Sequence, residues 1–185
     1  MTTAESEILW TEANQACLVA EFARLKRVLG SSTEEPWEEP QLPAQPLAID
    51  RLCQLFDLSA FERDVLLLCA GVEMDSKLAA LCGEAQGYPQ RTYATLGLAL
   101  AALREPHWSA LTPDRPIRRF RLVDVETGHG LCTAPLRIDE RILHYLAGLN
   151  ALDPRLRALI EASAFPEWIW DGHKAVAAQA VHIFK

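Results

Sequence analysis

Hydrophobic residues recur along this chain with a spacing that predicts helices over most of its length. Between residues 5 and 29 the apolar positions lie three and four apart, which places them on one face of an amphipathic helix. These positions are Leu18, Phe22, Leu25 and Leu29. Basic residues near the end of this segment, followed by Gly30, favour a helix end there.

The segment LAIDRLCQLFDLS predicts a second helix, and the residues expected on its inward face are Ala48, Leu52, Leu55 and Phe56. Ser59, followed three residues later by Glu62, forms a capping box that begins another helix. The middle of that helix, VLLLCAGV, is uncharged around its whole circumference, so we expect neighbouring elements to cover it on every side. The core should therefore contain Leu66, Leu67 and Leu68.

Two further helices should complete the helical part. Asp75 is expected to cap a helix from Ser76 to about Ala85, and another helix should run from about Thr95 to Leu103. The inward positions of the latter are Leu96, Ala99, Leu100 and Leu103.

The pattern after Pro106 changes to that of a sheet. RPIRRFRLVDV (115–125) and LCTAPLRI (131–138) predict two strands joined by a glycine-bearing turn. One face of the second strand should carry Cys132, Ala134, Leu136 and Ile138. Pro135 makes this strand an edge strand or a bulged one, because proline has no backbone N–H to donate. Asp139 can then cap a helix bearing Ile142, Leu143, Leu146 and Leu149, and Asp153-Pro154 opens another short helix.

The element order predicts a mainly α (α+β) fold: a winged helix-turn-helix core with a two-stranded β-wing and additional N- and C-terminal helices. We divide the chain into an N-terminal amphipathic helix (1–30), a linker rich in proline and glutamate (31–46), the winged-helix domain (47–150) and a C-terminal helical segment (151–185). The last residues have the pattern of a helix without a stop signal, which suggests a piece of a longer protein; a native terminus is the alternative.

Composition limits the classes of partner. The 185 residues carry a formal net charge of -7, so the chain as a whole repels phosphate backbones and anionic lipids. No apolar run approaches the roughly 20 residues that span a bilayer, and the N-terminus has no secretory pattern. Five cysteines without a CxxC pair indicate reduced thiols. We therefore expect a cytoplasmic protein that has no membrane partner.

Four segments in order carry a resemblance to a known family: LCQLFDLSAFERDVLLLCAGVEMD, TLGLALAAL, PIRRFRLVDV and PLRIDERILHYLAG. Over residues 47–150 the chain resembles the winged-helix domain found N-terminal to a class of bacterial AAA+ ATPases, some of them encoded with contractile injection systems. The resemblance implies a parent ATPase, which could form a hexameric ring, with its core C-terminal to this domain.

The chain itself contains no GxxxxGK[ST] loop, the turn that holds nucleotide phosphates. ATP and Mg²⁺ are therefore expected only for such a core, and we expect this chain to have no cofactor and no catalytic role. The leading hypothesis is a noncatalytic domain that contacts its own ATPase domain, a partner or a substrate. The alternative is a DNA-binding regulator that uses arginines of the wing.

Two candidate interaction surfaces follow from this interpretation. If the helix at 95–103 is the recognition helix, its outward side chains have almost nothing that reads a base. These positions are Thr95, Gly97, Leu98, Ala101 and Ala102. The predicted first wing strand carries Arg115, Arg118, Arg119 and Arg121. These arginines could hold a phosphate backbone, pair with the chain's own carboxylates, or dock a protein.

Other chemistry is less well supported by the sequence. His129 and Cys132 lie three residues apart on the wing, but a zinc site would need a second such pair. Asp64, Glu73 and Asp75 could suggest acid–base chemistry; we interpret Asp75 as a cap and the other two as solvated helix ends. Trp168 and Trp170 are interpreted as docking anchors.

Overall fold

The computed structural model describes residues 3–30 and 46–149. The helices in chain order are α1 (Thr3–Leu29), α2 (Ala48–Phe56), α3 (Ala60–Met74), α4 (Ser76–Ala85), α5 (Leu96–Ala102), the 3-10 helix η1 (Trp108–Leu111), α6 (Pro116–Arg119) and α7 (Glu140–Leu146). Strands β1 (Val123–Val125) and β2 (Leu136–Ile138) lie between α6 and α7. The predicted fold class, mainly helical with a two-stranded antiparallel ribbon, is confirmed.

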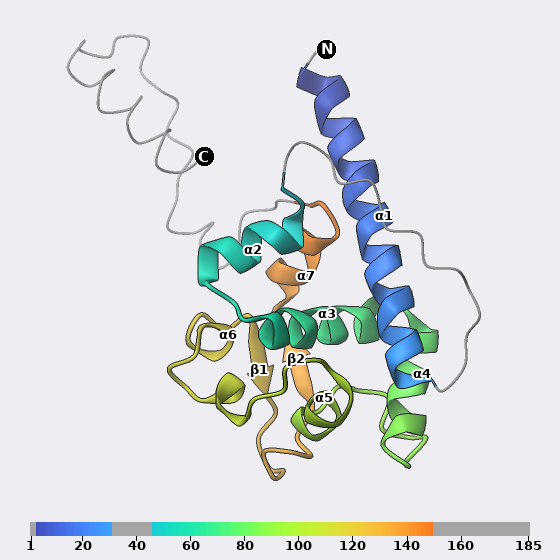
Figure 1. The fold of residues 1–185 in the computed structure, drawn as a ribbon, viewed down its shortest axis with the longest axis vertical. Coiled ribbons are helices and arrows are strands. Elements are labelled where there is room, and N and C mark those ends of the chain that lie inside the picture. The colour runs from blue at the N-terminus through green and yellow to red at the C-terminus, as the bar shows by residue number, and fades with distance from the viewer. Residues whose placement is uncertain (1–2, 31–45, 150–185) are drawn as a thin grey trace, which may run out of the picture. The chain divides into compact units, whose positions relative to one another are not determined.

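Helix α3 is enclosed by its neighbours. Its central leucines, Leu66, Leu67 and Leu68, have no exposed surface, as the uncharged run predicts. The helix packs against α1, α4 and β2, and Figure 1 shows it between α2 and α7 on one side and α5 with the ribbon on the other. Burial of each such leucine contributes roughly 1.5–3 kcal/mol, so α3 is the centre of the hydrophobic core.

Local capping interactions set where the helices begin. The Ser59 hydroxyl accepts the backbone N–H of Glu62, and the Glu62 carboxylate accepts the N–H of Ser59, so the predicted capping box is present. Asp75 accepts two backbone N–H groups at the start of α4, and Asp139 does the same for α7. All three predicted caps are therefore confirmed, because each depends only on residues close in the sequence.

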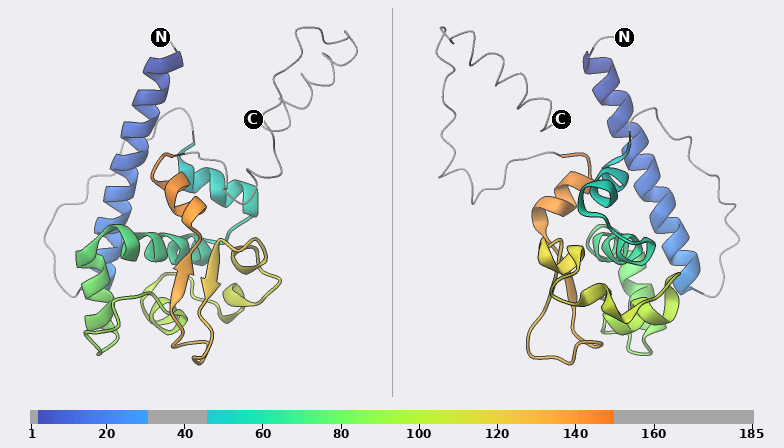
Figure 2. Two further views of the ribbon diagram at one scale, coloured as in Figure 1. Left: turned by 180° about the vertical axis from the view of Figure 1, so that it is seen from behind. Right: turned by 60° about the vertical axis from the view of Figure 1, so that its left-hand side comes forward.

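Helix α1 packs along α3 and α4 through the predicted stripe, in which Leu18, Phe22 and Leu25 are buried. The side chain of Asn14 extends this attachment to two other elements. Its amide nitrogen donates to the Leu146 carbonyl at 2.7 Å, and its oxygen accepts the Ala48 N–H at 3.0 Å. Helix α1 is therefore joined to the start of α2 and to the end of α7 (Figure 2).

The ribbon is shorter than the predicted strands. β1 pairs with β2 in the register Val123↔Ile138 to Val125↔Leu136, and an isolated bridge joins Thr95 to Pro135. Residues 115–122 were predicted as strand, and this prediction is wrong because they form α6 and the turn after it. Pro116 occupies the first turn of α6, where its fixed φ angle favours a helix and its missing N–H is not needed.

Two apolar residues predicted to face inward are exposed instead. Leu55, near the end of α2, is 73% exposed, and Ile49 takes its expected place in the core. Leu149 is 60% exposed because α7 ends at Leu146, one turn earlier than its apolar pattern suggests.

Several predictions lie outside the described residues. They concern the linker at 31–46, of which only Pro46 is described, and the segment 151–185 with Trp168 and Trp170. Among the described helices, none combines the length and the apolar character needed to cross a membrane.

Candidate interaction surface

Helix α5 does not present the face that its sequence suggests. Leu98 is only 5% exposed and Thr95 only 2%, so the prediction that both point outward is wrong. Of the predicted outward residues, Ala101 is exposed, whereas Gly97 and Ala102 are half-buried. An exposed alanine offers little area for recognition, so α5 is a poor candidate for a docking helix.

The loop between β1 and β2 covers the first turn of α5. The backbone N–H of Gly97 donates to the Cys132 carbonyl at 3.0 Å. A Cβ at position 97 would lie 2.9 Å from that oxygen, so only glycine allows this approach without a shift. The loop therefore occupies space that a partner of α5 would need.

The four arginines assigned to a wing strand lie on and around α6, the helix immediately before β1. Arg118 and Arg119 belong to α6, Arg115 is its N-cap residue, and Arg121 follows it. A helical turn spreads these side chains around an axis, whereas a strand would align alternate ones on a face. Each arginine therefore has different surroundings.

Arg115 is held by a buried carboxylate of its own domain, although its side chain is 35% exposed. Its guanidinium binds the Glu62 carboxylate through two contacts, Nη2–Oε2 at 2.6 Å and Nε–Oε1 at 3.2 Å. Burial acts to raise the pKa of Glu62, but the bonds from Arg115 and Ser59 outweigh it and lower that pKa. Arg115 is thus an internal ion-pair residue that joins α6 to α3, and it is not free to bind a partner.

Of the other three arginines, Arg119 and Arg121 are exposed, whereas Arg118 is half-buried like Arg115. Arg121 pairs with Asp124 at 3.1 Å, and both side chains are more than half exposed. Arg118 donates to the Leu111 carbonyl at 3.4 Å, and the Arg119 guanidinium lies 5.4 Å from the centre of the Phe120 ring. Among the described residues, neither Arg118 nor Arg119 has a carboxylate partner.

An aromatic pair beside these arginines was missed by the sequence analysis. Phe120 is 49% exposed, and its ring centre lies 5.0 Å from that of Phe56 at the end of α2. We call the resulting region the α2–α6 surface; its members are Leu55, Phe56, Arg118, Arg119, Phe120 and Arg121. Pro116 at a helix start was the signal that could have moved Phe120 out of the predicted strand.

Comparison with known families agrees with this architecture. The family model described as "Winged helix domain, variant" matches residues 23–160, about three quarters of the 185 residues. The chain belongs to this winged-helix family. Searches of curated proteins and of solved structures gave no match.

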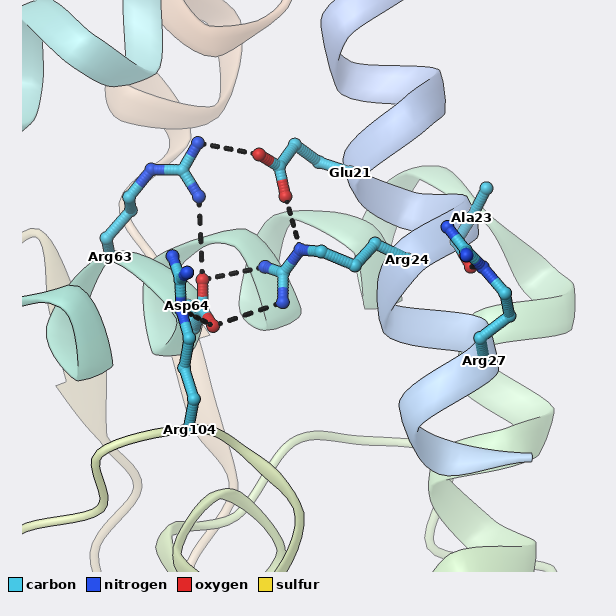
Figure 3. Close-up of polar contacts among 7 residues, drawn as sticks. All are labelled: Glu21, Ala23, Arg24, Arg27, Arg63, Asp64 and Arg104. Atoms are coloured by element: carbon cyan, nitrogen blue, oxygen red, sulfur yellow. Dashed lines mark hydrogen bonds and ion pairs between the residues drawn. The ribbon is translucent and has the colours of Figure 1, made fainter. Parts of the chain in front are cut away.

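A cluster of charges surrounds the buried Asp64 and joins α1 to α3 (Figure 3). Asp64 is fully buried and binds Arg24 of α1 at 2.7 Å, Arg104 after α5 at 3.2 Å and Arg63 at 3.5 Å. Glu21 of α1 binds both Arg24 and Arg63, at 2.8 and 2.7 Å. The prediction that Asp64 is a solvated helix end is therefore wrong.

This cluster favours a structural role over acid–base chemistry. Burial acts to raise the pKa of Glu21, but hydrogen bonds from Arg63 and Arg24 outweigh it and lower the pKa. A carboxylate held ionised by arginines is a poor proton acceptor near neutral pH. Glu73, the other carboxylate considered, is 42% exposed and pairs with Arg137 at 3.3 Å.

The remaining candidates for chemistry are the cysteines and a possible metal site. All five cysteines are free, and Cys17, Cys69 and Cys82 are buried as expected, while Cys53 and Cys132 are half-buried. Burial raises the pKa of Cys17 to about 11, which keeps this thiol protonated. Within residues 3–30 and 46–149, no group of three or more His, Cys, Asp or Glu side chains is placed to hold a metal ion.

Proposed function

We propose that this winged-helix domain is a noncatalytic protein-interaction module, the N-terminal part of a AAA+ ATPase. One observation carries the interaction part: α5 is largely buried, whereas the α2–α6 surface exposes an aromatic ring beside arginines. Aromatic and arginine side chains are enriched at the centres of protein–protein interfaces. The ATPase part rests on the resemblance of residues 47–150 alone.

The wing supports protein contact over DNA contact. Residues 126–135, which join the two strands, contain no lysine or arginine and include Glu126. A wing that grips DNA needs cationic side chains for the phosphates or the minor groove. Arg137 of β2 does not supply this charge, because it pairs with Glu73 and lies 3.8 Å from Glu126.

DNA binding is the second candidate, and a specific observation favours it. Arg118 and Arg119 lie on the helix that leads into the wing and have no carboxylate partner in the described part of the chain. Two phosphate contacts would give a slope of about −2 in log K against log [salt]. Affinity would then fall roughly tenfold between 50 and 200 mM salt.

Titration of the chain with a fluorescein-labelled 25-base-pair duplex at 50 mM salt separates the two candidates. The module proposal expects no saturable binding at micromolar protein. Saturable binding that the double variant Arg118→Glu/Arg119→Glu abolishes would replace it with the DNA proposal. The matched control is Lys77→Glu/Arg91→Glu, which changes the net charge by the same amount on other elements.

The ATPase part is tested by the reading frame that encodes this chain. A GxxxxGK[ST] loop within several dozen codons after Lys185 is the expected finding, since that loop would hold the nucleotide. A frame without such a loop would refute the AAA+ assignment and leave the interaction module to be tested on its own.

A further inference from the structure

We infer that the α2–α6 surface binds an acidic segment of a partner protein, one that carries an aromatic or large aliphatic side chain among its carboxylates. This inference rests on the proposed interaction function and adds the place and the chemistry of the partner. Three features of the surface lead to it: its apolar centre, its two arginines without a carboxylate partner, and the left-handed backbone at Asp57 and Arg121.

The apolar centre is the first feature. Phe120 leaves 49% of its surface in water although Phe56, part of the core boundary, lies against it. Leu55, which precedes Phe56 in the last turn of α2, is 73% exposed. Single exposed apolar residues are common, but Phe120 against the tilted ring of Phe56 and Leu55 next to Phe56 in the chain leave two large apolar side chains that gain by leaving water. A partner side chain that fits here must itself be apolar.

The charge around this centre is the second feature. Arg118 and Arg119 have no carboxylate partner in residues 3–30 and 46–149, although the chain carries seven more negative than positive charges. The nearby acids are already engaged: Asp124 pairs with Arg121. Asp57 and Asp114 act on Arg115, which Glu62 already holds. Carboxylates of a partner could form ion pairs with Arg118 and Arg119, because arginine binds carboxylates through paired hydrogen bonds.

The backbone is the third feature. Asp57 and Arg121 directly follow Phe56 and Phe120, whose rings are tilted by 46°, and both residues have left-handed φ angles, 51° and 55°. Aspartate tolerates this region, whereas for arginine it is strained and glycine or asparagine would fit better. In the described part of the chain, the Arg121 side chain is 71% exposed and makes an ion pair with the exposed Asp124. An exposed arginine in this strained backbone conformation is consistent with a use of its charge outside the fold.

A nucleic acid fits these features less well than an acidic peptide. Phosphates would satisfy the arginines, but a sugar–phosphate backbone offers no apolar group for Leu55 and Phe120. An acidic peptide supplies both kinds of contact in one short segment, with the apolar residue as anchor and the carboxylates around it.

Selection of a phage-displayed library of random 12-residue peptides on the full chain tests the inference without a known partner. The expected peptides are rich in Asp and Glu around at least one Trp, Phe or Leu. Their affinity should fall at least tenfold for Arg118→Glu/Arg119→Glu and for Phe120→Ser. The controls should bind as the natural chain does: Lys77→Glu/Arg91→Glu for charge and Tyr88→Ser for an aromatic side chain that is also 49% exposed.

Each outcome decides something, once circular dichroism and urea unfolding have shown that the variants fold. No enrichment, or peptides that are not acidic, or peptides that bind Phe120→Ser undiminished, would overturn the inference. If the control variants lose peptide binding instead, the docking surface lies elsewhere and the interaction function survives. If no peptide is selected and the DNA duplex binds through Arg118 and Arg119, both the inferred acidic partner and the proposed interaction function are refuted.

Discussion

Replacing Asp64 by asparagine should destabilise the domain more than the same change at an exposed carboxylate. The substitution keeps the size of the side chain and removes the negative charge beneath three guanidinium groups. Removing one partner of a buried ion pair costs about 3–5 kcal/mol. The arginines are only partly buried, with Arg24 at 24%, Arg63 at 17% and Arg104 at 56% exposure, so water can recover part of that loss. We therefore expect a loss of about 2–3 kcal/mol.

Urea unfolding of the full chain measures this loss through the shift of the midpoint at constant slope. The matched control is Asp124→Asn, the same chemical change at an exposed carboxylate that pairs with Arg121. Exposed pairs contribute about 0.2–1 kcal/mol, so the control should lose no more than that. Because a domain of this size is stable by about 5–15 kcal/mol, the Asp64 variant should still fold.

A double-mutant cycle identifies the partner that matters. Combining Asp64→Asn with Arg24→Met should cost less than the sum of the two single changes, because both remove the same contact between α1 and α3. Additive costs, or a loss for Asp64→Asn no larger than that for Asp124→Asn, would show that the cluster does not hold α1 in place.

Three other changes test separate parts of the structure. Gly97→Ala should lower stability by about 1–3 kcal/mol because the added Cβ would lie 2.9 Å from a backbone oxygen. The control Gly130→Ala should be nearly neutral, because its added Cβ would lie 3.5 Å from the nearest atom. Thermal unfolding compares the two variants. Arg121→Gly should not destabilise the domain, since relief of the left-handed backbone offsets the lost exposed pair, and a loss above about 1 kcal/mol in urea would contradict this. The pKa of Glu21 lies below its ordinary 4.5 because the hydrogen bonds from Arg63 and Arg24 outweigh the effect of burial. The ionised Glu21 therefore contributes fully to the free energy of unfolding above pH 4.5, and this contribution is lost as the pH falls through the folded-state pKa. Stability measured by urea unfolding should therefore drop on acidification below that value, less steeply in Glu21→Gln, and equal slopes would refute the link.

Features set by neighbouring residues were predictable from the sequence. The caps at Ser59, Asp75 and Asp139 each join groups two or three positions apart, so the residue types alone identify them. The enclosure of α3 was predictable for a related reason, because a helix without a polar face can be stable in water only when it is covered.

Features set by distant residues were not predictable. The burial of Leu98 accompanies the contact between the loop that joins β1 to β2 and the first turn of α5. The sequence of α5 alone gives no sign of this contact. Asp64 looked like an ordinary polar helix residue because its partners Arg24 and Arg104 each lie 40 positions away. The α2–α6 surface was half predicted: the arginines were identified, but the assumed strand placed Phe120 beside them without the ring of Phe56.

The amide of Asn14 has a mechanical consequence. It binds the first residue of α2, Ala48, and the last residue of α7, Leu146, close to where the described chain ends. The start of α2 and the end of α7 are therefore both hydrogen-bonded to the same side chain of α1. A pulling force applied to the chain at Leu149 would therefore act on α1, through the bond to Leu146, as well as on α7.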